Sequence, residues 1–241
     1  MRSGNPTLSG NAFSRAAATS TSGGVMTVQG TINKTLILLG ISIFVASLVF
    51  ANPAQWVPFV LPAAIIGFIV ALVTCFKLDW APVTAPVYAG FEGIVLGGVS
   101  MMFEQAYPGI VFQAVTLTFG TMFAMLLSYK AGWVKVTDQF RSMLFAATGG
   151  IMLVYVIGWL ISLFGGSMPF IHSSGPFGIL FSLIVVGVAA LNLVLDFDFI
   201  ERGAQSGAPK NAEWYGAFAL MVTLIWLYME ILRLLSKLRS R

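Results

Sequence analysis

Three acidic residues lie within six positions at the end of a long apolar run. Asp196, Asp198 and Glu201 close a run that begins near Phe177 and is long enough to cross the ~30 Å hydrocarbon core of a bilayer. A carboxylate inside such a run costs about 2.5 to 3.5 kcal/mol on insertion scales, so it needs shielding by protein, water or a cation. Asp196 precedes Gly203 by seven residues, which places it roughly 10 Å inside the membrane. We therefore expect Asp196 to be the centre of a proton or cation site.

Glu92 is a second carboxylate that the sequence places inside the membrane. It follows Pro86, the start of another apolar run, by six residues, so it reaches a depth similar to that of Asp196. Two carboxylates that share a site of low dielectric cannot both ionise cheaply, so such a pair holds a proton or a cation. Asp196 and Glu92 are therefore candidate calcium ligands. Asp198 lies about 200° around the helix from Asp196 and can instead meet Arg202, four residues on.

Glu92 and the secondary candidates also have structural interpretations. Glu92 can bond a neighbouring helix as a protonated acid, and Asp198 can be an interfacial residue at a helix end. Glu230 lies three residues before Arg233, so a local ion pair explains it, although it is also a secondary site candidate. Two further titratable residues are expected in solvated loops: Glu104 and His172.

Composition indicates the class of the protein. Of its 241 residues, 58% are hydrophobic and 9% are charged, and the mean hydropathy is +0.89, which is typical of a polytopic membrane protein embedded in the lipid bilayer. The net charge of +4 comes from basic residues scattered over loops and a tail, so it does not predict nucleic-acid binding. One Cys and one His exclude a Cys-based metal site. The sequence contains no HExxH and no Gly-x-Ser-x-Gly motif, which argues against an enzyme.

Seven apolar runs predict an all-α membrane protein, a bundle of seven transmembrane helices. Each run has about 16 to 23 residues, a length suited to a spanning helix. The runs are 35–50, 56–76, 86–103, 107–128, 142–164, 177–199 and 214–235. Residues 1–33 are rich in Ser, Thr, Gly and Asn and predict a disordered tail. Residues 34–236 form the expected bundle, and 237–241 form a basic tail.

The distribution of Lys and Arg predicts the orientation in the membrane. Nine basic residues fall in the N-terminal tail and the even-numbered loops, and none falls in the first, third or fifth loop. Because loops rich in Lys and Arg stay in the cytoplasm, we expect the N-terminus there. Four more basic residues crowd the C-terminus, although seven spans would place that end outside. The sequence leaves the side of the C-terminal tail open.

Several short motifs, in this order, resemble the Bax inhibitor-1 family, whose bacterial members include the YccA-like proteins. The motifs are Glu92-Gly93 with Leu96-Gly97, the segment 107–114, Asp196 with Arg202-Gly203, and the segment 230–235. The resemblance covers about residues 35–236. It implies seven helices with the last one central, a pH-sensitive calcium leak, and a place in the plasma membrane of a bacterium.

The resemblance also implies a pair of aspartates that this chain lacks. In the family, an Asp of the sixth helix pairs with an Asp of the seventh. Asp196 matches the first, but Thr223 stands at the position of the second, ten residues before Arg233. Thr223 can make a hydrogen bond but cannot share a charge. Glu92 or Glu230 is the expected substitute, and Glu92 fits better by depth.

Two functions follow as alternatives. The first is a cation leak channel or proton-coupled transporter centred on Asp196, with Glu92 and Thr223 as further oxygen ligands for calcium or a proton. No cofactor is expected beyond calcium itself. The second is a regulator that binds another membrane protein, such as a membrane-anchored protease, as the resemblance to YccA-like proteins suggests.

Overall fold

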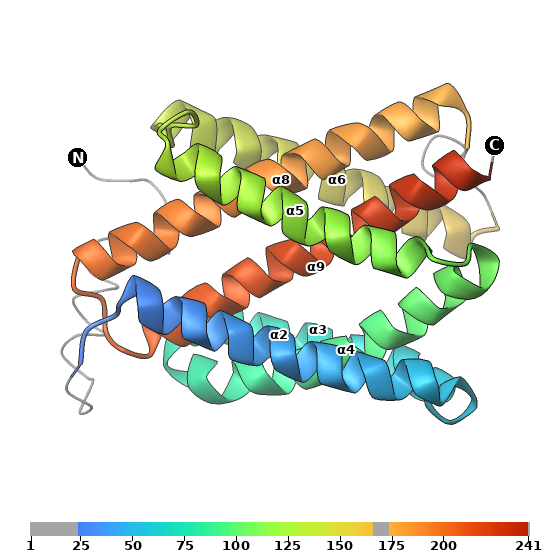
Figure 1. Ribbon diagram of the computed structural model, residues 1–241, viewed down its shortest axis with the longest axis horizontal. Helices are drawn as coiled ribbons and strands as arrows, with labels where there is room; N and C mark the ends of the chain where they lie inside the picture. Colours follow the sequence, from blue (N-terminus) through green and yellow to red (C-terminus); the bar gives the residue numbers. More distant parts are fainter. Residues whose placement is uncertain (1–23, 166–173, 241) are drawn as a thin grey trace. The chain divides into compact units, whose positions relative to one another are not determined.

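A computed structural model describes residues 24–165 and 174–240 (Figure 1). In this described part of the chain, seven helices are long and apolar enough to cross a membrane, which confirms the predicted all-α membrane fold. The helices are α2 (Val28–Ala51), α3 (Pro53–Phe76), α4 (Ala81–Ala106), α5 (Ile110–Lys130), α6 (Asp138–Leu163), α8 (Pro176–Gln205) and α9 (Ala212–Arg239), with a short 3-10 turn, η1 (Leu78–Trp80), before α4. The only extended pairing among the described residues is an isolated bridge between Val25 and Pro209.

Several helices are longer than the apolar runs that predicted them. α2 begins at Val28, because Thr27 caps it by accepting a hydrogen bond from the Gly30 amide at 2.9 Å. Residues 28–33, which we expected in the tail, are therefore helical. α8 continues to Gln205, and α9 continues to Arg239, so residues 237–239 belong to the last helix rather than to a separate tail. The added turns are polar, and hydropathy alone does not detect them.

The chain forms two compact units. Unit 1 consists of the described residues up to Val99 together with Asp198–Met221, and unit 2 consists of Ser100–Phe197 and the residues from Val222 onward. Three helices, α4, α8 and α9, therefore contribute one part to each unit.

In unit 1, glycines of α4 bring it into close contact with α2 (Figure 1). A Cβ at Gly93 would lie 2.8 Å from the Ser42 carbonyl oxygen, and one at Gly97 would lie 2.7 Å from that of Ala46. The Ser42 hydroxyl donates a hydrogen bond to the Ala89 carbonyl oxygen at 2.7 Å. Small residues thus allow two helix backbones to touch, as expected for packing inside a membrane.

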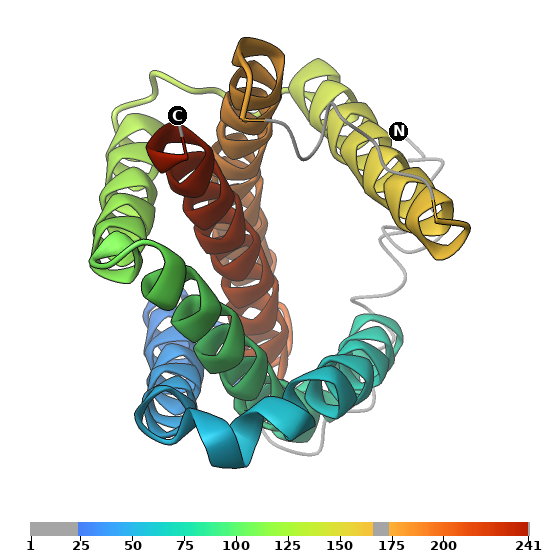
Figure 2. The same cartoon turned by 90° about the vertical axis from the view of Figure 1, so that its right-hand side faces the viewer.

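Among the described spanning helices, α9 has the largest buried share of its apolar stretch (Figure 2, seen from its C-terminal end). Half of its most apolar stretch is buried, compared with 6% of that of α6. Its fully buried side chains include Met221 in unit 1 and Leu227 and Leu232 in unit 2. The last helix therefore contributes buried side chains to the core of each unit, whereas little of α6 is buried.

Candidate functional site

Asp196 lies on α8 in unit 2, where its partner is Thr223 of α9. The Thr223 side chain makes a hydrogen bond with the Asp196 carboxyl group, and Thr223 is itself buried. The other carboxyl oxygen, Oδ2, is buried and has no hydrogen-bond partner among the described residues. A buried oxygen without a donor is costly. This carboxyl group therefore gains stability from a proton or a cation.

Buried apolar residues flank this pair along both helices. Leu193 and Val194 on α8 are fully buried, and so are Leu224 and Leu227 on α9, each at most 3% exposed. These side chains come from the apolar stripes that make the two helices suitable for the membrane. Because they exclude water, they strengthen any electrostatic interaction that Asp196 makes. A negative charge on Asp196 would therefore interact strongly with any cation that came close to it.

Glu92 lies in unit 1, on α4. It makes a side-chain hydrogen bond with Tyr88, one turn earlier on the same helix. The Tyr88 ring packs edge-on against Phe218, with ring centroids 5.1 Å apart. The structure thus gives Glu92 a partner within its own helix, and the pairing of Glu92 with Asp196 stays a prediction.

The two secondary candidates, Asp198 and Glu230, form the local ion pairs that the spacing predicted. Asp198 Oδ2 lies 2.9 Å from Nε of Arg202 in unit 1. In unit 2, Glu230 Oε1 lies 2.9 Å from Nη1 of Arg233 and also accepts a hydrogen bond from the Tyr155 hydroxyl at 2.8 Å. Both carboxylates are buried, so each already has a cation beside it. Both differ in this respect from Asp196, whose described hydrogen-bond partner is the neutral Thr223.

Glu104 was predicted to lie in a solvated loop, and this prediction is wrong. It belongs to the last turn of α4 and accepts hydrogen bonds from the amides of Gly109 at 2.6 Å and Val111 at 3.1 Å. Its carboxylate therefore satisfies amide donors at the start of α5, which have no partner within that helix. His172, the other predicted loop residue, lies outside the described residues.

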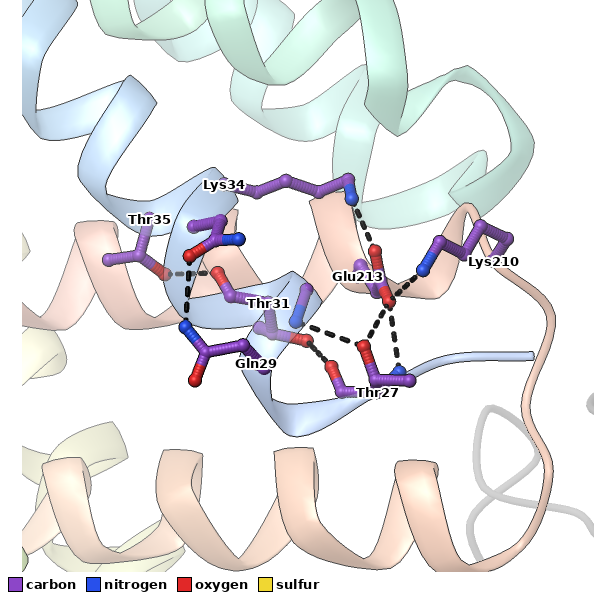
Figure 3. A network of polar contacts seen from close by, with 9 residues as sticks. Thr27, Gln29, Thr31, Lys34, Thr35, Lys210 and Glu213 are labelled. Carbon is purple, nitrogen blue, oxygen red and sulfur yellow. Dashed lines mark hydrogen bonds and ion pairs between the residues drawn. The ribbon is translucent and has the colours of Figure 1, made fainter. Parts of the chain in front are cut away.

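The sequence did not reveal the most extensively bonded carboxylate, Glu213, in the first turn of α9 in unit 1 (Figure 3). Its side chain is fully buried and forms ion pairs with Lys34 of α2 and, at 2.7 Å, with Lys210. It also accepts hydrogen bonds from the amide and the hydroxyl of Thr27, both at 2.9 Å. We call these four residues, Glu213, Lys34, Lys210 and Thr27, the Glu213 clamp.

The Glu213 clamp holds the segment before α2 against the turn between α8 and α9. The Met26 amide donates to the Ala208 carbonyl oxygen at 2.7 Å, and the Lys210 amide donates to that of Gly24 at 3.1 Å. Met26 is buried, and a Cβ at Gly203 would lie 2.9 Å from its sulfur atom. The Gly203 of the Arg-Gly motif therefore makes room for Met26.

Asp196 and Thr223 alone do not make a site for a resident calcium ion. Calcium takes about six to eight oxygen ligands, and Asp196 with Thr223 offers a carboxylate and one hydroxyl. Among the described residues, no group of three His, Cys, Asp or Glu side chains could hold a metal ion. This donor set instead suits a proton, or a cation in transit that keeps most of its water.

Comparison with known families agrees with these features. The family model for Bax inhibitor 1 like proteins matches residues 5–240. The chain belongs to this family. The match confirms the resemblance and extends it at both ends, because the motifs covered only about residues 35–236. No curated protein and no solved structure matches the chain. The Bax inhibitor 1 like family is not a family of enzymes, and its match together with the seven apolar helices identifies an integral multi-pass membrane protein.

Proposed function

We propose that this Bax inhibitor 1 like protein is a pH-sensitive leak for cations, calcium among them, that is controlled by Asp196. The observation that carries the proposal is the buried Oδ2 of Asp196, which has no hydrogen-bond partner among the described residues although it lies in a membrane-spanning helix. A group in this position responds directly to the supply of protons and cations.

The two protonation states of Asp196 would make different contacts. The protonated acid can donate a hydrogen bond to the Thr223 hydroxyl and join α8 to α9 without any net charge. The ionised carboxylate can only accept, so the Thr223 hydroxyl must turn and donate to it. The negative charge then attracts a cation and water into apolar surroundings. Mild acid would thus close the path, and proton release would open it.

Thr223 makes this switch simpler than a pair of aspartates. A hydroxyl can donate or accept, so it follows Asp196 through both states without carrying a charge. In a carboxylate pair the two protons are coupled, and the pair titrates as a unit. With Thr223 in place, one proton on Asp196 governs the site, and the pH response is that of a single group. Glu92, in the other unit, is a further candidate to modify this response.

Flux in liposomes tests the proposal. The purified protein is reconstituted with a calcium dye inside the vesicles, and calcium entry is followed at several values of pH from mildly acidic to mildly alkaline. We expect protein-dependent entry that increases as the pH rises, and none in protein-free vesicles. A correctly folded protein that admits no calcium at any pH would contradict the proposal.

A regulator of another membrane protein, such as a membrane-anchored protease, is the second candidate function. It is supported by α6, of which only 6% of the apolar stretch is buried. A Cβ at Gly149 or at Gly150 of α6 would have nothing within 4 Å, so another helix has room to approach the backbone there. A regulator of this kind would show no flux in liposomes. Replacing Gly150 by Leu would then abolish its effect in cells, although the isolated protein remained folded.

A further inference from the structure

The last two turns of α9 carry basic residues in a setting that the proposed leak does not use. They line a cavity of about 320 Å³ within unit 2. Its lining includes Arg233, Lys237, Tyr107 and three serines, Ser174, Ser236 and Ser240. Neither Asp196 nor Thr223 belongs to it. Its role can therefore be tested separately from the flux.

Lys237 is the unusual member of this group. It is 4% exposed, and its ammonium donates to the Gly178 carbonyl oxygen at 3.0 Å and to the Ser182 hydroxyl at 2.8 Å. Both acceptors are neutral, and the ammonium has a third N–H. Among the described residues, Lys237 forms no ion pair with a carboxylate. A buried cation without an ion-pair partner is expensive, so an anion beside Lys237 would stabilise it.

Arg233 also lines this cavity, and it has donor groups that the described residues do not use. Its Nη1 atom bonds both oxygens of Glu230 and the Tyr155 hydroxyl. Its Nε and Nη2 groups have no hydrogen-bond partner among the described residues. Glu230 forms its ion pair with Arg233, so Arg233, Lys237 and Glu230 together keep a net positive charge.

We propose that this cavity binds a phosphate group. Lysine holds phosphate as a point charge, and arginine adds a planar fork of donors. The volume lies at the lower end of the range for small-molecule sites, which suits a headgroup-sized anion. The cavity lies at the end of a membrane-spanning helix and includes Tyr107, a residue type that favours the interface where lipid headgroups lie. The phosphate can belong to an anionic lipid or be free in solution.

Two measurements on the full-length protein distinguish these sources. In the first, native mass spectrometry compares retained phosphatidylglycerol with retained diacylglycerol, which lacks the phosphate. In the second, the melting temperature in lipid-free detergent is followed as inorganic phosphate is added, with chloride at equal ionic strength as the reference. Preferential retention of phosphatidylglycerol would identify a lipid headgroup as the ligand. Stabilisation by inorganic phosphate without that preference would identify free phosphate.

Matched variants show whether the effect belongs to this cavity. Lys237→Met removes the buried charge. It should weaken binding of phosphatidylglycerol or of inorganic phosphate about tenfold, the size expected for one charge-assisted contact. Lys135→Met makes the same change at an exposed lysine in the α5–α6 connection and should leave it unchanged. Ser240 is exposed at the end of the chain. Ser240→Asp therefore places a competing carboxylate at the cavity without disturbing a buried group, and it should weaken binding by a similar factor.

Three results would overturn the proposal. The first is a wild-type protein that shows neither preference for phosphatidylglycerol nor stabilisation by phosphate. The second is a binding effect that Lys135→Met weakens as much as Lys237→Met does, because the basic surface as a whole would then explain it. The third is wild-type binding by Ser240→Asp. This last measurement decides the matter if Lys237→Met does not fold.

Discussion

Two carboxylates in membrane-spanning helices of this protein have opposite surroundings. Glu213, in unit 1, has four donors, two of them lysine ammonium groups. Asp196, in unit 2, has the Thr223 hydroxyl on one oxygen and a buried second oxygen without a hydrogen-bond partner in the described structure. The first arrangement holds a permanent negative charge. The second can change its charge, and that difference separates a structural carboxylate from a functional one.

The helix around each acid explains the difference. Glu213 lies at the start of α9, where Lys210 is three residues away and Lys34 reaches it from α2. Asp196 is deeper in α8, and the first basic residue after it, Arg202, is bonded to Asp198 at 2.9 Å. Asp198 thus engages the cation on this part of α8. Such an arrangement leaves Asp196 with only neutral partners among its described contacts.

The largest expected effect is on stability, from Glu213→Gln. The substitution leaves Lys34 beside a neutral amide, although only 17% of the Lys34 side chain is exposed. Removing one partner of a buried ion pair costs about 3 to 5 kcal/mol. We therefore expect a clear fall in melting temperature in detergent. The segment before α2 should also become easier to cleave with protease, because the clamp no longer holds it.

Glu201→Gln provides the matched control, because Glu201 is an exposed carboxylate of the same unit. It should change the melting temperature little, since exposed charges contribute about 1 kcal/mol or less. Equal melting temperatures for Glu213→Gln and Glu201→Gln would show that the Glu213 clamp is not structural, and the contrast with Asp196 would disappear.

The second effect is on flux rather than on stability, from Asp196→Asn. The amide keeps a hydrogen bond to Thr223 but cannot release a proton near neutral pH. We expect the flux ratio between neutral and acidic pH to fall toward one, with a melting temperature close to that of the wild type. Wild-type pH dependence in this variant would remove Asp196 from the centre of the mechanism.

A smaller effect is expected from Thr223→Asp, which adds a second carboxylate beside Asp196. The pair would hold one proton jointly, and losing that proton would leave two charges in apolar surroundings. Repulsion between the two charges would add to the effect of losing the proton. The dependence of flux on pH should therefore become steeper than in the wild type. Thr223→Asn serves as the uncharged control. Flux curves for Thr223→Asp that coincide with those of the wild type would argue against a single-proton switch.

The sequence predicted the helices and several local pairs because those features are encoded locally. Apolar runs located all seven spans, and spacings of three and four residues predicted the Glu230–Arg233 and Asp198–Arg202 ion pairs. The position of Thr223 relative to Arg233 pointed to the residue that bonds Asp196. That inference used the family resemblance, because no local pattern relates residues on separate helices.

The Glu213 clamp could not be predicted in the same way. Lys34 and Glu213 are 179 residues apart, and only the tertiary fold brings them together. Hydropathy also places Glu213 at the end of a span, where an acid is ordinary and suggests nothing. Burial of Lys237 was equally hidden, because a lysine at a helix end normally extends toward water.

The smallest effect is expected from Asp198→Asn, which tests whether pairing with a cation is what makes an acid inert. Asp198 is two residues from Asp196 and is also buried, but it bonds to Arg202, whose side chain is 56% exposed. Because water can solvate Arg202 once the pair is lost, the fall in melting temperature should be smaller than for Glu213→Gln. The pH dependence of calcium entry should match that of the wild type, since Asp198 already has its counter-charge. If Asp198→Asn flattened that dependence as much as Asp196→Asn, then proximity to the membrane interior, rather than the lack of a cation partner, would determine which carboxylate responds to pH.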